Sequence, residues 1–254
     1  MKKQVCTTAV SIAFGLALAT AWAEQSNIQV SAGVVYTSGT FGGTEEIEEL
    51  YVPISASIDA GRLGFKLVVP YLRVSEPGVS GITTESGLGD VVGSVTVYDA
   101  YYSPDLGLAL DLSGSVKFGT ADEAKGLGTG EPDYSIYLDG YKFFENVTLL
   151  GSMGYRWRGE TVDSLVDDVF IGSAGAVFSV SSETLLGFVY DYRESALLDA
   201  DDIQELTGFI SFELNEDWRA ELSAFAGFTD SSPDWGGGVA VSTDLRRFRL
   251  RDGR

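Results

Sequence analysis

The residues of this 254-residue chain that could bind an ion or a polar solute are charged side chains and tyrosines at every second position. Asp111 and Lys117 alternate with apolar residues in this way, and so do Arg219 and Glu221. Alternate residues share one face of a β-strand, so these groups would line a polar face opposite an apolar one. The candidates are Lys66, Asp111, Lys117, Tyr137, Asp139, Tyr141, Arg156, Asp191, Arg193, Glu205, Arg219 and Glu221.

Buried charges must pair or meet water, so this mixture of signs predicts either a narrow wet pore or a nearly closed, salt-bridged interior. Tyr137 and Tyr141 would offer stacking surfaces to an aromatic solute or simply fill space, with filling favoured. We name them, with the charged residues, as candidates for the path of a solute.

Several other chemistries are disfavoured. The chain has no histidine, which removes His-dependent hydrolases, and we expect no catalytic residues and no enzyme activity. A net charge of −20 argues against nucleic acid as a partner. The stretch from Asp199 to Glu205 lacks the glycine of a calcium loop, and the glycines of 126–130 favour turns over a phosphate cradle. We therefore predict no metal site and no cofactor.

Alternation of apolar and polar residues extends along almost the whole chain and predicts an all-β fold without a convincing helix. Twelve antiparallel strands are expected, at 27–37, 50–59, 63–73, 88–99, 106–118, 133–143, 146–157, 168–180, 183–193, 203–214, 218–229 and 235–246. Most are as long as the ~9–11 residues that a tilted strand needs to cross a bilayer.

The connections between these strands alternate between long and short, which is typical of an outer-membrane β-barrel and not of a soluble sandwich. The long connections are 38–49, 74–87, 119–132, 158–167, 194–202 and 230–234. Aromatic residues gather on the apolar face beside them, as in an interfacial girdle: Tyr36, Tyr71, Phe118, Tyr134, Tyr155, Trp157, Tyr190, Tyr192, Phe228 and Trp235. The long connections would then be the outer loops.

The first residues predict export. Two lysines precede an apolar run, and Ala21-Trp22-Ala23 has the small residues that a signal peptidase recognises. We expect a signal peptide over 1–23 and an outer-membrane β-barrel over 24–254, located in the cell outer membrane of a Gram-negative envelope.

Three spaced motifs resemble those of the outer-membrane transporter family named for the meta-cleavage (MetA) pathway of phenol degradation. They are Gly87-Leu88-Gly89-Asp90, then Lys117-Phe118-Gly119-Thr120, then Leu127-Gly128-Thr129-Gly130 with Asp133. The second departs from the family, which usually has Pro-Thr-Gly-Asp where this chain has Gly119-Thr120-Ala121-Asp122. The resemblance implies a porin-like transport protein for hydrophobic or aromatic solutes.

We therefore expect a channel or transporter for small solutes. The alternative is a structural or adhesive barrel without transport, whose acidic outer loops bind cations, including those that bridge to lipopolysaccharide. In both cases the expected partners are outer-membrane lipid, lipopolysaccharide and the barrel-assembly machinery. A small-molecule solute is a further partner of the channel.

Overall fold

The computed structural model describes residues 27–78, 81–159, 167–197 and 200–245, which form antiparallel strands and one 3-10 helix, η1 (Glu123–Lys125). The strands are β1 (Asn27–Gly39), β2 (Ile47–Ala60), β3 (Leu63–Gly78), β4 (Gly81–Leu88), β5 (Val92–Ser103), β6 (Leu108–Lys117), β7 (Asp133–Phe143), β8 (Val147–Trp157), β9 (Val169–Ser179), β10 (Thr184–Arg193), β11 (Ile203–Glu213), β12 (Trp218–Gly227) and β13 (Trp235–Asp244).

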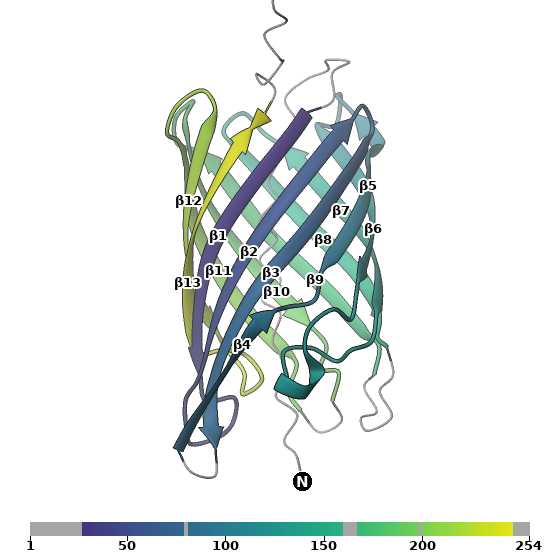
Figure 1. The fold of residues 1–254 in the computed structure, drawn as a ribbon. Coiled ribbons are helices and arrows are strands. Elements are labelled where there is room, and N and C mark those ends of the chain that lie inside the picture. The colour runs from purple at the N-terminus through teal and green to yellow at the C-terminus, as the bar shows by residue number, and fades with distance from the viewer. Residues whose placement is uncertain (1–26, 79–80, 160–166, 198–199, 246–254) are drawn as a thin grey trace, which may run out of the picture.

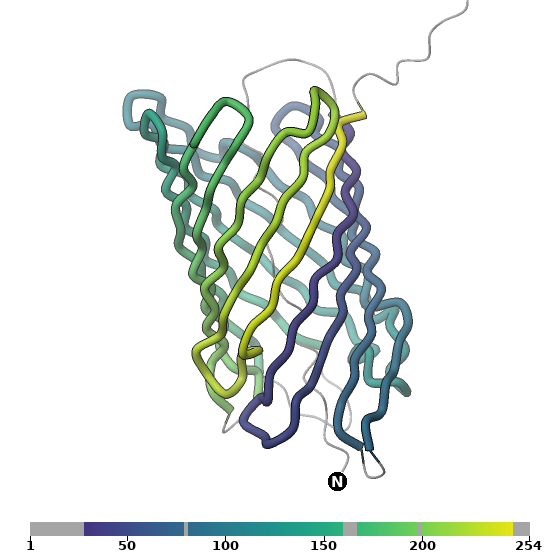
Figure 2. The backbone as a smooth tube through the Cα atoms, turned by 90° about the vertical axis from the view of Figure 1, so that its left-hand side faces the viewer, coloured from purple at the N-terminus to yellow at the C-terminus, as the bar shows by residue number. Residues whose placement is uncertain are grey.

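The sheet closes into a barrel because β1 pairs with β13 on one side and with β2 on the other. β3 pairs with β5 along its first part and with β4 along its last part. β4 and β5 therefore share one place in the wall, on either side of the break at 89–91. The barrel has twelve strand positions, which confirms the prediction from the sequence, and its strands run obliquely around the axis (Figures 1 and 2).

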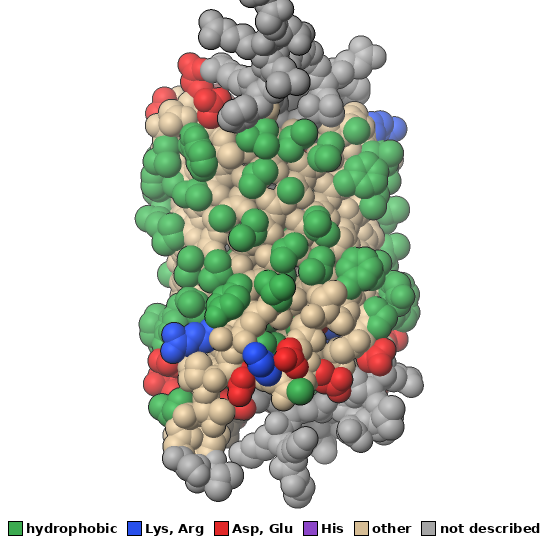
Figure 3. Space-filling view, viewed as in Figure 1, with side chains coloured by type: hydrophobic (Ala, Val, Ile, Leu, Met, Phe, Trp, Pro, Cys, Tyr) green, Lys and Arg blue, Asp and Glu red, His purple; other side chains and the backbone are tan. Residues whose placement is uncertain are grey.

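The apolar face of each strand points outward. In β6, Leu112 is 41% exposed on the outer surface, whereas the neighbouring Ser113 faces inward and donates or accepts a hydrogen bond with Thr96 at 2.9 Å. Figure 3 shows the result, a belt of apolar side chains around the barrel with charged side chains gathered mainly below it. Such a belt is stable only against lipid, because it would expose far too large an apolar surface to water.

The predicted aromatic girdle lies on this outer surface, beside the long loops. Four of its tyrosines hydrogen-bond to polar side chains at the rim; for example, the Tyr36 hydroxyl donates to Glu48 at 2.7 Å, and that of Tyr192 to Asp202 at 2.7 Å. The rings also contact one another, as in Tyr36–Trp235, whose centroids are 5.5 Å apart. Apolar ring bodies with bonded polar tips are suited to the level of the lipid headgroups.

One region departs from the predicted strands. The stretch 74–87, expected to be a long loop, instead continues β3 to Gly78 and returns as β4, and this hairpin extends beyond the rest of the wall (Figure 1). β2 likewise begins at Ile47, so that Glu49 belongs to the wall and not to a loop. Because these segments are rich in charged residues and glycine, the sequence did not predict that they pair as strands.

No described helix is both long and apolar enough to cross a bilayer. The predicted signal peptide, 1–23, lies outside the described residues.

Candidate functional site: the barrel lumen and its outer mouth

All twelve candidate residues lie on inward-facing positions of the wall, as the alternation predicted. Most are half-buried, so their polar groups retain contact with the space inside the barrel. The register of the strands, which the sequence could not supply, arranges them in rows that run obliquely from strand to strand. Three rows and one cluster at the mouth describe the site.

The first row, here called the acidic row, crosses six neighbouring strands from β6 to β11. Each member is directly opposite the next, in the order Asp111, Asp139, Ser152, Ser173, Asp191 and Glu205. Asp111 accepts the backbone N–H of Asp99 at 2.8 Å, and Asp139 accepts the Ser152 hydroxyl at 2.6 Å. Like charges directly opposite one another destabilise a sheet, so two such pairs in a single row point to a role other than stability.

Arg193 is the cation nearest the end of this row. It occupies the next inward position of β10 after Asp191, and it interacts electrostatically with Asp191, Glu205 and Glu49. Glu49 belongs to β2, a distant part of the wall. Sequence reasoning missed it because it assigned this residue to an outer loop.

Glu49 and Glu205 are both deeply buried, each with only 7% of its surface exposed. One carboxylate oxygen of each, Oε1, has no hydrogen-bond partner among the described residues. A buried carboxylate oxygen without a partner carries a full desolvation penalty, and native structures tolerate few of them.

The second row borders the acidic row on the side of the short turns and is here called the apolar row. It consists of Tyr141, Leu150, Gly175, Val189 and Thr207, again each directly opposite the next. Apart from the glycine, these side chains are half-buried and face the lumen. Inward positions two residues apart along a strand are separated by roughly 7 Å, so the apolar and acidic rows lie side by side at about that spacing.

The third row is rich in serine and runs from β3 to β8, with Lys66 and Arg156 at its ends. Between them lie Ser94, Ser115 and Ser135. The Arg156 guanidinium donates to the Ser135 hydroxyl and to the Tyr137 hydroxyl, each at 3.3 Å. Small hydroxyl side chains leave room in the lumen while keeping its wall polar.

Four large inward-facing rings take up little of the lumen, because each lies over a glycine of an adjacent strand. The pairs are Tyr98 over Gly64, Tyr137 over Gly154, Phe209 over Gly187 and Phe225 over Gly236. A Cβ on any of these glycines would lie within 2.2 to 2.5 Å of the ring, closer than atoms can approach. The rings therefore lie flat along the wall, and Tyr137 is held there rather than projecting into the lumen.

At the outer mouth the three sequence motifs meet around Lys117, which is mostly buried. Its ammonium lies 3.0 Å from the Asp90 carboxylate and 3.4 Å from that of Asp133, and it donates to the Thr129 hydroxyl at 3.2 Å. We call this group the Lys117 cluster. Lys117 is thus held in ion pairs at the mouth and is less available to a solute than its place in the sequence suggested.

The β6–β7 loop, 118–132, is fixed by the same cluster. Asp90 accepts the backbone N–H groups of Thr120 at 3.0 Å and Ala121 at 2.9 Å. Leu127, 1% exposed, packs with Leu72, Val74 and Ala121. As predicted, glycines supply the turns, because Gly126 and Gly130 have positive φ values of 71° and 73°.

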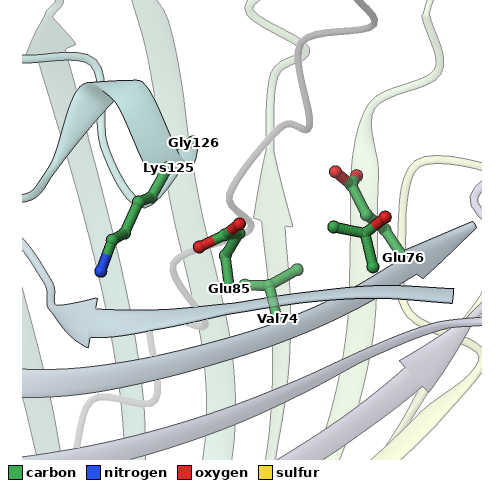
Figure 4. Close-up of a pocket in the computed structure, with 6 residues that line it drawn as sticks. Val74, Glu76, Glu85, Lys125 and Gly126 are labelled. Carbon is green, nitrogen blue, oxygen red and sulfur yellow. The ribbon is translucent and has the colours of Figure 1, made fainter. Parts of the chain in front are cut away.

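Beside this loop is a small cavity between the β3–β4 hairpin and η1, with a volume of about 20 Å³ (Figure 4). Glu76, Glu85 and Lys125 line it, and the Lys125 ammonium donates to the Ser86 carbonyl at 3.3 Å. This is room for about one water molecule, so the cavity does not bind a solute.

Two further candidate residues, Arg219 and Glu221, lie near the short turns. Arg219 forms an ion pair with Glu213 at 2.5 Å. Glu221, on the same strand, is the next inward residue of β12. Within the described ranges, no group of three or more Asp, Glu, His or Cys side chains is arranged to hold a metal ion.

No protein-family model and no curated protein sequence matches the chain. Solved structures do resemble it. The COG4313 outer membrane channel from Pseudomonas putida F1 superposes with a TM-score of 0.72 at 12% identity, covering 89% of this chain and 97% of that one. The KdgM porin superposes with a TM-score of 0.56 at 10% identity, covering 85% of this chain and 98% of that one.

The translocator domain of the autotransporter NalP from Neisseria meningitidis gives a TM-score of 0.53 at 10% identity, with coverages of 87% and 89%. At these identities the likeness concerns the fold. The first of these is an outer membrane channel and the second a porin, and together with the closed barrel and its lipid-facing belt they define this chain as a β-barrel of the cell outer membrane.

Proposed function

We propose that the chain is a channel for small solutes across the outer membrane. The observation that supports this best is the lumen wall, whose rows of half-buried charged, hydroxyl and tyrosine side chains run from the outer mouth toward the short turns. A barrel serving only as a scaffold would gain stability by filling its interior with apolar side chains. The rings that lie flat over glycines also support an interior kept open.

The class of solute follows in part from the resemblance of the three motifs to the MetA-pathway transporter family, which favours hydrophobic or aromatic molecules. Tyr141 in the lumen wall would provide contact to such a molecule. We propose no catalytic role and no cofactor. Outer-membrane lipid, lipopolysaccharide and the barrel-assembly machinery remain proposed partners.

A planar lipid bilayer tests the proposal. The refolded full-length mature protein should produce discrete single-channel currents, and liposomes containing it should swell in isotonic solutions of small solutes. Heat-denatured protein is the control. A correctly folded barrel, verified by its heat-modifiable migration in detergent gels, that gives neither current nor swelling would contradict a channel.

The second candidate function is a structural or adhesive barrel, and the acidic outer rim favours it. Glu46 and Glu48 lie at this rim, beside the girdle. Deletion of the gene should then weaken the envelope, and calcium should change how purified barrels bind lipopolysaccharide, without any conductance.

A further inference from the structure

The lumen combines two chemistries at a fixed spacing. The acidic row supplies four carboxylates across β6 to β11, and the apolar row supplies Tyr141, Leu150 and Val189 beside it. Because neighbouring inward positions on a strand are about 7 Å apart, a small molecule can touch both rows at once. It would need a positively charged end and a short apolar body.

The charge balance at the β10–β11 end of the acidic row favours a cation there. Asp191 and Glu205 are directly opposite one another, and Glu49 of β2 interacts electrostatically with the same cation, Arg193. Arg193 is the cation that interacts with all three. Three carboxylates around one guanidinium leave an excess of negative charge.

The unpartnered oxygens are independent support for a ligand. Glu205, opposite Asp191 in the acidic row, is 93% buried and its Oε1 has no partner among the described residues, as is also true of Glu49 on β2. An ammonium group carries three N–H donors and no acceptor, so it can satisfy carboxylate oxygens that the described protein groups leave unbonded.

We propose that the lumen selects small organic ammonium ions with an apolar body. The ammonium end is bound by Asp191 and Glu205, and the body lies along the apolar row at Val189 and Leu150. The inference rests on the proposed channel function and specifies the solute class. Anions are disfavoured along the same path, because they would meet four carboxylates in succession.

The first measurement is ion selectivity of single channels in a KCl gradient. The reversal potential should show preference for K⁺ over Cl⁻. In the Asp191→Asn/Glu205→Gln double variant each lost carboxylate should lower the K⁺/Cl⁻ permeability ratio by up to about 25-fold, because one unit charge ~4 Å away in water favours K⁺ and disfavours Cl⁻ by about fivefold each. Both changes keep side-chain shape and relieve a like-charge pair, so the barrel should still fold.

The matched control is Glu145→Gln, the same chemical change at an exposed residue of the short β7–β8 turn. It should leave the permeability ratio unchanged. Equal effects of this control and the double variant would mean that overall charge, not the acidic row, sets selectivity.

The second measurement concerns the apolar body. Butylammonium should block the K⁺ current at lower concentration than ammonium, which has no such body, and butyrate should not block. Val189→Thr keeps shape but replaces a methyl group by a hydroxyl, so it should raise the half-blocking concentration of butylammonium and leave that of ammonium unchanged.

The outcomes separate the two proposals. Absence of any conductance would overturn the channel function itself. Conductance that prefers anions, or equal block by butylammonium and ammonium, would leave the channel intact and overturn the inference about its solute.

Discussion

Gly187 and Phe209 show at the scale of single residues how a large inward ring is held against the wall. They are directly opposite on β10 and β11, and a Cβ at Gly187 would lie 2.3 Å from the Phe209 ring. The ring lies flat only because the glycine has no side chain. This pairing covers the backbone of the glycine and compensates for its weak intrinsic preference for strands.

We expect Gly187→Ala to lower the free energy of unfolding by about 1–3 kcal/mol, because the ring must leave its place on the wall. Gly208→Ala is the matched control. Gly208 is also opposite a phenylalanine, Phe188, but on the outer surface, where a Cβ would lie 3.3 Å from the ring and the exposed ring can relieve this tight contact by a small shift. Urea unfolding in lipid vesicles provides the measurement.

A double-mutant cycle makes the interpretation specific. In a Phe209→Ala background, Gly187→Ala should cost almost nothing, because the ring with which it collides is gone. A cost that persists in that background would show that the backbone at Gly187, and not the ring, forbids a side chain.

The chemistry of single residues was predictable from the sequence to the extent that it depends on alternation. All twelve candidates face inward because each lies in phase with its strand. The cross-strand neighbours of these residues were not predictable, because they depend on the register between strands. A register shift of two residues would place Asp191 opposite Thr207 instead of Glu205, and every side chain would stay on the same face.

At the scale of elements, the loop between β6 and β7 depends on a single buried lysine. Lys117 is 20% exposed, and its partners Asp90 and Asp133 are 11% and 5% exposed. Removing the cation would leave two carboxylates close together with little water. Asp90 would then no longer be held in place to accept the backbone N–H groups that fix the loop.

Lys117→Met should therefore destabilise the loop by about 3 kcal/mol, the lower end of the cost of breaking a buried ion pair. Hydrogen exchange of the amides in 118–132 should accelerate, while exchange in β10 and β11 stays slow. Lys125→Met is the control, because Lys125 is exposed and its ammonium donates to one carbonyl. If both variants exchange alike, the Lys117 cluster does not hold the loop.

The elements themselves were predicted well where alternation is strong and poorly where it is interrupted. β6 lies within its predicted range because leucines alternate through it. β4 was missed because Gly81, Thr83, Thr84 and Glu85 carry no apolar signal, and it is stabilised by pairing with β3. The glycine-rich motifs pointed to a family resemblance, but their convergence on Lys117 required the folded chain.

At the scale of the whole molecule, the two ends of the barrel differ. The short turns include Gly61-Arg62, whereas the opposite end carries the hairpin and the 118–132 loop (Figure 1). The aromatic girdle lies at that end too. Outer-membrane barrels place long loops outside the cell and short turns in the periplasm. With this orientation the mouth built around Lys117 lies outside the cell, and the orientation itself stays a prediction.

Cysteine labelling of intact cells tests this orientation. Loss of the predicted signal peptide removes Cys6, the one cysteine of the sequence. An introduced cysteine is then the single residue of the mature protein that a thiol reagent can label. A membrane-impermeant maleimide should label Ala124→Cys in the β6–β7 loop and not Ser182→Cys in the β9–β10 turn. Both positions are exposed, so accessibility within the fold does not bias the comparison. After the cells are lysed, both should react equally, and labelling of Ser182→Cys alone in intact cells would reverse the assigned orientation.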